Sequence, residues 1–182
     1  YLGYHALRQA GMKRTPALWL GGSLGLILQT PIEVFDGLYE GWGFSWGDMA
    51  ANAAGPALLA GQELLWQEQV IRFKFSFWRS PYAEQAHGYL GDNFLQSLFY
   101  DYNGHSYWLS APLNRLLLRE HLPEWLCLSV GYSANGMFGE FENRRSWAGS
   151  PIPPTPRTRQ FLLSLDIDPS RIHTRHRWLN VL

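Results

Sequence analysis

The pattern of apolar and polar positions changes once along the chain, close to Gln67. Before that point, apolar and small residues form long runs interrupted by glycine and proline. After it, apolar and polar residues alternate, most clearly over residues 70–78, 125–133 and 161–168. Alternation with a period of two residues is typical of strands that have one apolar face. The sequence therefore predicts a helical region over 1–66 and a β-rich region over 67–182, joined as one domain.

Glycine and proline divide the helical region. Residues 1–11 are interpreted as the end of a helix that stops at Gly11, and Thr15 followed by Pro16 predicts the start of the next. An apolar helix is expected over 17–29, and Pro31 should bend or interrupt it. Ser45 is a good N-cap for a further helix from Trp46 to about Leu65.

The β-rich region adds two weaker strand candidates, 106–118 and 172–182, and a proline-rich loop over 143–158 that should lack regular structure. The predicted fold class is α+β, with a helical hairpin or bundle followed by an antiparallel sheet. Strands with one apolar face also occur in outer-membrane barrels, so a small or partial barrel with helices is the alternative. Five or six strands are fewer than the eight of the smallest closed barrels, which favours the sheet.

Composition excludes several classes of protein. The formal net charge is zero, and we recognise no nucleic-acid-binding motif, so nucleic acid is not an expected partner. The single cysteine, Cys127, excludes an intrachain disulfide and any multi-cysteine metal site. The longest apolar run, 17–28, is shorter than a spanning helix needs, so we do not expect a conventional transmembrane helix.

The window from Thr15 to Ile71 contains no Lys or Arg but several acids. Helical spacing puts Glu33 and Asp36 on one helix face, and Asp48 and Asn52 on one face of the next helix. If these faces met, Glu33, Asp36, Asp48 and Asn52 would offer oxygen ligands to a divalent cation such as calcium or magnesium. Alternatively, these side chains cap helix ends, hydrogen-bond across the helix pair or are solvated. We expect no cofactor, with the divalent cation as the alternative.

The C-terminal segment is basic. If residues 172–182 form a strand, one face carries a set of cationic side chains that would suit lipid phosphate or lipopolysaccharide: Arg171, His173, Arg175 and Arg177. The same residues would equally serve to pair with the acidic half of the chain.

Three sequence elements carry a family resemblance: Gly21-Gly-Ser-Leu-Gly25, Glu33-Val-Phe-Asp36, and Gly43-Phe-Ser-Trp-Gly-Asp48 followed by Asn52 and Gly55. Together they resemble the signature of the predicted periplasmic lipoproteins of the YfiM type. The chain as a whole is similar to the longer members of that family from Bacteroidota. The resemblance implies a location in the bacterial cell envelope, on the outer-membrane or periplasmic side, and no established activity.

The expected function follows from this resemblance and from the aromatic content. Nine Trp, nine Tyr and ten Phe are many for 182 residues, and such side chains favour interfaces and membrane boundaries. We expect a noncatalytic accessory or scaffolding component that docks on an outer-membrane protein complex. Two alternatives stay open: a lipid- or metal-dependent envelope enzyme that uses Glu33, Asp36 and Asp48, and a protein that binds lipid or lipopolysaccharide.

Overall fold

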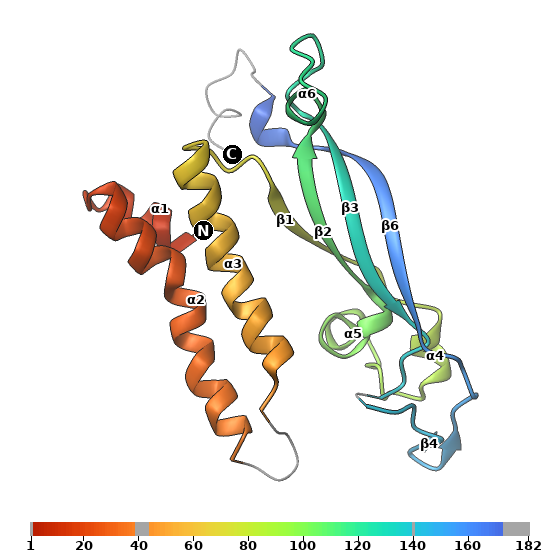
Figure 1. Ribbon diagram of the computed structural model, residues 1–182. Coiled ribbons are helices and arrows are strands. Elements are labelled where there is room, and N and C mark those ends of the chain that lie inside the picture. The colour runs from red at the N-terminus through yellow and green to blue at the C-terminus, as the bar shows by residue number, and fades with distance from the viewer. Residues whose placement is uncertain (1, 39–43, 140, 173–182) are drawn as a thin grey trace. The chain divides into compact units, whose positions relative to one another are not determined.

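A computed structural model describes residues 2–38, 44–139 and 141–172 of the chain (Figure 1). The chain divides into two compact units, a helical unit over Tyr1–Val70 and a sheet unit over Ile71–Leu182. The helices and the four-stranded antiparallel sheet confirm the predicted α+β class.

The helical unit contains α1 (Leu2–Gln9), α2 (Arg14–Asp36) and α3 (Trp46–Leu65), and α2 and α3 form a hairpin (Figure 1). Its small core consists of Tyr4, Ala17, Leu18 and Leu59. The helices α1 and α2 approach so closely that a Cβ atom on Gly21 would lie 2.4 Å from the backbone nitrogen of Tyr4. The packing of this unit therefore depends on a residue without a side chain.

The predicted start of the last helix is confirmed, because the Ser45 hydroxyl accepts a hydrogen bond from the Asp48 N–H at 3.2 Å. The predicted interruption at Pro31 is wrong, since α2 continues through it to Asp36. Proline removes one hydrogen-bond donor, and the rest of the helix tolerates that loss. With 23 residues, α2 is long and apolar enough to cross a membrane by length and composition alone, and it extends well beyond the apolar run 17–28. The expectation of no conventional transmembrane helix stays a prediction.

The sheet unit is built on β1 (Arg72–Phe77), β2 (His105–Pro112), β3 (Leu126–Asn135) and β6 (Thr158–Ile167), paired antiparallel in the order β1-β2-β3-β6. Each of the three alternating runs forms a strand. The weaker run 106–118 becomes β2 followed by the short helix α6 (Leu113–Leu116). Residues 173–182, most of the other weak candidate, lie outside the described part of the chain.

The connections between the strands contain further short elements: α4 (Tyr82–Gln85), α5 (Phe94–Tyr100), η1 (Tyr102–Gly104), β4 (Ser146–Trp147), β5 (Ser150–Pro151) and η2 (Pro169–Arg171). The expectation of no regular structure over 143–158 is therefore wrong at β4 and β5. The two strands are joined by Ala148 and Gly149, which have φ of 49° and 83°. Two consecutive positive φ angles are those of a tight hairpin turn, and alanine gives no signal for it.

The core of the sheet unit lies among these connections, in a cluster of Ala83, Ala86, Leu90, Phe138 and Ile152. None of the residues of this cluster lies on one of the four strands, although Ala111 of β2 and Cys127 of β3 are also buried.

Candidate functional site

One face of the sheet, the apolar face, is covered with large hydrophobic side chains that are exposed. Strand register places Leu109 of β2 beside Val130 of β3, and Val130 beside Leu163 of β6. The exposed fractions reach 72% for Leu163 and 82% for Phe161. The apolar face comprises Phe73, Phe75, Tyr107, Leu109, Val130, Tyr132, Phe161, Leu163, Leu165 and Ile167.

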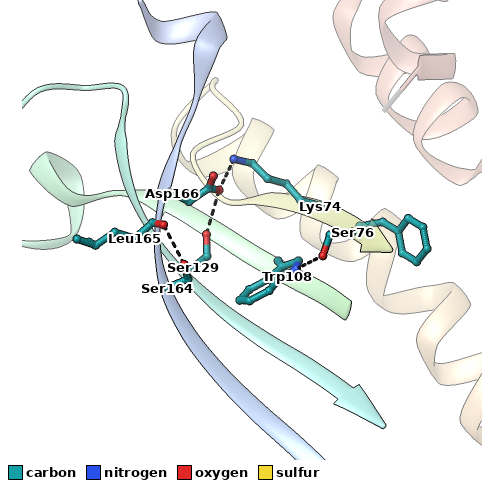
Figure 2. A pocket seen from close by; sticks show the side chains of 8 residues that line it. Lys74, Ser76, Trp108, Ser129, Ser164, Leu165 and Asp166 are labelled. Carbon is teal, nitrogen blue, oxygen red and sulfur yellow. Dashed lines mark hydrogen bonds and ion pairs between the residues drawn. The ribbon is translucent and has the colours of Figure 1, made fainter. Parts of the chain in front are cut away.

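The opposite face, the polar face, carries Arg72, Lys74 and Asp166, whereas Arg159, near the start of β6, has the parity of Phe161 and lies at the end of the apolar face. Lys74 of β1 forms an ion pair with Asp166 of β6, and Asp166 also accepts hydrogen bonds from the Ser110 and Ser129 hydroxyls at 2.9 and 3.1 Å. Figure 2 shows Lys74, Ser129 and Asp166 converging above the sheet. Four strands thus contribute to one network, in which the two serines are almost fully buried.

A second ion-pair group lies next to this network at the end of the strands. Asp168 accepts a hydrogen bond from Arg72 at 3.0 Å and another from Arg171 at 3.2 Å. The Asp168 side chain is buried, so its charge is compensated by two guanidinium groups.

A hollow of about 270 Å³ opens on the polar face, and Figure 2 shows the side chains around it. Its lining includes Trp108, whose indole N–H donates to the Ser76 hydroxyl at 2.8 Å. Trp108 lies over Gly131, where a Cβ atom would come within 2.6 Å of the ring. The hollow is therefore lined by serine hydroxyls, Lys74 and Asp166 together with the apolar residues Trp108, Phe75 and Leu165.

The network suits charge neutralisation better than catalysis. Burial raises the pKa of the Asp166 carboxyl, but hydrogen bonds from Lys74, Ser110, the Ile167 N–H and Ser129 outweigh it and hold the pKa below its ordinary value. A carboxylate with a lowered pKa is a weaker base, so the serine hydroxyls stabilise its charge and are not activated by it.

Cys127 lies on β3 with only 1% of its surface exposed. Burial raises the pKa of its thiol, which disfavours the thiolate that nucleophilic chemistry needs. The residue therefore behaves as a small buried apolar group.

Replacing Asp166 by asparagine is expected to make the stability of the protein less sensitive to acid. Because the folded-state pKa of Asp166 is lowered, the stabilisation it provides is complete above its unfolded-state pKa, near 4, and is lost as the pH falls through the lower folded-state value. Urea unfolding at pH 7 and over a series from about pH 5 to 2.5 measures this. Asp166→Asn should be less stable than wild type at pH 7, and the difference should shrink below about pH 4.

Asp92 is exposed in the same unit, so Asp92→Asn is the matched control and should follow the wild-type curve. Parallel pH dependence of wild type and Asp166→Asn would contradict the role of the network.

The acidic residues singled out in the sequence lie on the α2–α3 hairpin. Glu33 and Asp36 are on the last turns of α2, whereas Asp48 and Asn52 are on the first turns of α3. In the described ranges of the chain, no group of three or more His, Cys, Asp or Glu side chains is arranged to hold a metal ion. The cation site stays a prediction.

The basic residues are only partly described. Arg171 lies in η2 and is ion-paired with Asp168, with 10% of its side chain exposed. This arrangement leaves little of its surface to a lipid phosphate. His173, Arg175 and Arg177 lie outside the described residues.

Sequence reasoning missed a buried polar group at the base of the helical hairpin, the end where α2 begins and α3 ends. Glu63 of α3 forms an ion pair with Arg14 at 3.5 Å, and accepts hydrogen bonds from the Tyr4 hydroxyl at 3.1 Å and from Gln69 at 3.3 Å. The sequence does not show this contact, since Tyr4 and Glu63 are 59 positions apart. Arg14 was a usable signal, because it is the last cation before the window that lacks Lys and Arg.

Comparison of the chain with protein-family models, with curated proteins and with solved structures gave no match.

Proposed function

We propose that the protein is a noncatalytic accessory or scaffolding component of the bacterial cell envelope, on the outer-membrane or periplasmic side. It docks on an outer-membrane protein complex through the apolar face of its sheet. The resemblance of the Gly21–Gly55 segment to the YfiM-type lipoproteins supports the location, and the geometry of the sheet supports the mode of action.

The observation that carries the proposal is the gathering of large exposed apolar side chains on one face of the sheet, with Arg159 as a charged residue at one end of that face. The apolar face extends over all four strands, while Lys74 and Asp166 neutralise each other on the polar face. Soluble monomeric proteins rarely expose contiguous apolar patches of more than a few hundred Å². Phe and Tyr, which are enriched in protein interfaces, supply half of this face.

The edge strands that border the apolar face favour a protein over lipid as its partner. Among the described strands, β1 and β6 each have a neighbour on one side only. An edge strand presents backbone N–H and C=O groups, which a partner strand can pair with but lipid hydrocarbon cannot satisfy. The ten-residue strand β6 is the longer edge and carries the most exposed side chains, so we place the contact there.

The rival functions stay predictions. An envelope enzyme that uses Glu33, Asp36 and Asp48, and a lipid or lipopolysaccharide binder that uses the basic C-terminal segment, each predict a ligand instead of a protein partner. The experiment below separates them, because native mass spectrometry of the extracted protein detects bound protein, lipid and metal together.

Charges on the apolar face are expected to break the complex. Val130→Asp combined with Leu163→Asp alters two cross-strand neighbours in the middle of the face. Because a partner surface would have to bury both carboxylates without compensation, recovery of a stoichiometric partner should fall at least about tenfold. The measurement is native mass spectrometry of tagged protein gently extracted from its own membranes.

Leu118→Asp is the matched control, since Leu118 is 89% exposed in the loop after α6 and lies outside the apolar face. It should recover the partner as wild type does. Equal partner recovery by the double variant, with its circular dichroism unchanged, would refute docking through this face. A chain that carries only lipid or metal would favour the rival functions.

A further inference from the structure

We infer that the helical hairpin of α2 and α3 inserts into the hydrocarbon region of a lipid bilayer. This inference goes beyond the proposed docking function, because it concerns the helical unit and assigns it a different partner, lipid. It does not depend on the sheet.

The surface of α2 is apolar where a soluble helix would be polar. Only Ala17, Leu18 and Gly21 of its 23 residues are buried. Large side chains project outward along its whole length, with 58% of Trp19 and 67% of Leu28 exposed. At 100° per residue these side chains cover more than half of the circumference of the helix: Trp19, Leu20, Leu24, Ile27, Leu28, Ile32, Val34 and Phe35. A helix that is apolar on so many sides belongs in a protein core or in a membrane.

The charges of the hairpin are gathered at its two ends. From Thr15 to Ile32, α2 has no charged residue, a stretch of about 27 Å at about 1.5 Å per residue. Arg14 lies at one end of this stretch and Glu33 at the other. The hydrocarbon core of a bilayer is about 30 Å thick and has a polar boundary on each side. The charge profile of the helix is therefore complementary to that of a bilayer.

The second helix is compatible with the same placement. Between Asp48 and Glu63, α3 carries no charge, and its middle is rich in alanine. The charge of Glu63 is compensated within the unit by Arg14, and its carboxylate also accepts a hydrogen bond from the Tyr4 hydroxyl. An acidic side chain near the membrane boundary is therefore not left unpaired.

Glycine lets the helices of this unit pack closely around its small core. Gly21 contacts the backbone of α1, and a Cβ atom on Gly22 would lie 3.1 Å from Leu59 of α3. Close packing through small residues while large apolar side chains face outward is the arrangement of membrane helices. Lipid is thus the occupant that fits the outward-facing residues.

Fluorescence labelling at Leu28 tests the inference. The full chain, with Cys127→Ala, receives Leu28→Cys in the middle of α2 and an environment-sensitive NBD label. We expect that mixing with vesicles of phosphatidylcholine and phosphatidylglycerol raises the NBD emission at least about twofold. In vesicles, doxyl groups on the acyl chains should quench the NBD fluorescence. Iodide in the water should quench it at most a tenth as strongly as it does in the absence of vesicles.

Two matched labels complete the test. Trp46→Cys, at the hairpin end of α3, should stay near the membrane boundary, and Leu118→Cys, in the sheet unit, should remain accessible to iodide. In addition, Leu28→Lys should lower the vesicle-bound fraction at least about tenfold, whereas Leu118→Lys should not. Persistent iodide quenching at Leu28 in vesicles would overturn the inference, as would shielding of that label without lipid, which would mean a protein occupant. Partner recovery by the apolar-face variants is a separate result, so either proposal can fail alone.

Discussion

Replacing Gly21 by alanine is expected to lower the free energy of unfolding of the helical unit by about 1–3 kcal/mol, the usual cost of overpacking a tight contact. The new Cβ atom would lie 2.4 Å from the Tyr4 nitrogen and 2.5 Å from the Gly3 carbonyl carbon. Both atoms belong to the backbone of α1, so no side chain can rotate away and α1 must move as a whole. That movement would also disturb the hydrogen bond from Tyr4 to Glu63.

Gly25→Ala is the matched control on the same helix, because a Cβ atom there meets nothing within 4 Å. Alanine favours helix over glycine by up to about 1 kcal/mol, so this variant should be as stable as wild type or more stable. Chemical unfolding in detergent followed by circular dichroism gives the free energies. Hydrogen exchange of α1 amides should quicken in Gly21→Ala alone. Equal stability of the two variants would mean that the contact between α1 and α2 contributes little.

The strand pattern was predictable from the sequence because each strand has one apolar side. Alternation identified β1, β3 and β6, and it already placed Lys74 and Asp166 on the side away from the phenylalanines and leucines. It was silent on pairing, since alternation within a strand says nothing about which strand lies beside it. The ion pair of Lys74 with Asp166 spans 92 positions, and only the strand order brings it together.

The connections between strands were not predictable in the same way. Helices α4 and α5 are too short to give a helical period, although Asn93, the N-cap of α5, is a residue type that favours helix starts. The β4–β5 hairpin depends on a positive φ at Ala148, a residue type that rarely adopts it. Local sequence propensity does not predict the backbone conformation where tertiary packing determines it.

The acids of the window that lacks Lys and Arg are accommodated differently at the two ends of the hairpin. At the base, Glu63 is buried and paired with Arg14, a cation just outside the window. At the other end, Asp48 lies exposed in the first turn of α3, where the positive end of the helix dipole favours an anion. An uncharged interval separates these two ends on both helices. This distribution is what an apolar surrounding along the hairpin would require.

Removing the Asp101 carboxylate is expected to have the largest effect on the sheet unit. Asp101 is fully buried and accepts hydrogen bonds from the Ser80 N–H at 2.7 Å, the Ser80 hydroxyl at 2.9 Å and Asn103 at 3.2 Å. Hydrogen bonds to a charged group contribute about 1.5–3 kcal/mol each, and Asp101→Ala leaves a buried N–H without its acceptor. We expect a loss of about 3 kcal/mol or more in the free energy of unfolding.

Asn103 links this carboxylate to the loop after β3, because its side chain also donates to the Met137 carbonyl at 2.9 Å and accepts from the Met137 N–H at 2.6 Å. Loss of Asp101 should therefore loosen residues far away in sequence, and hydrogen exchange around Met137 should rise together with that around Ser80. Asp92→Ala, an exposed acid in the same unit, should change neither the urea midpoint nor the exchange. If Asp101→Ala unfolds at the wild-type midpoint, these buried hydrogen bonds do not hold the connections together, and the apolar cluster around Phe138 must do so alone.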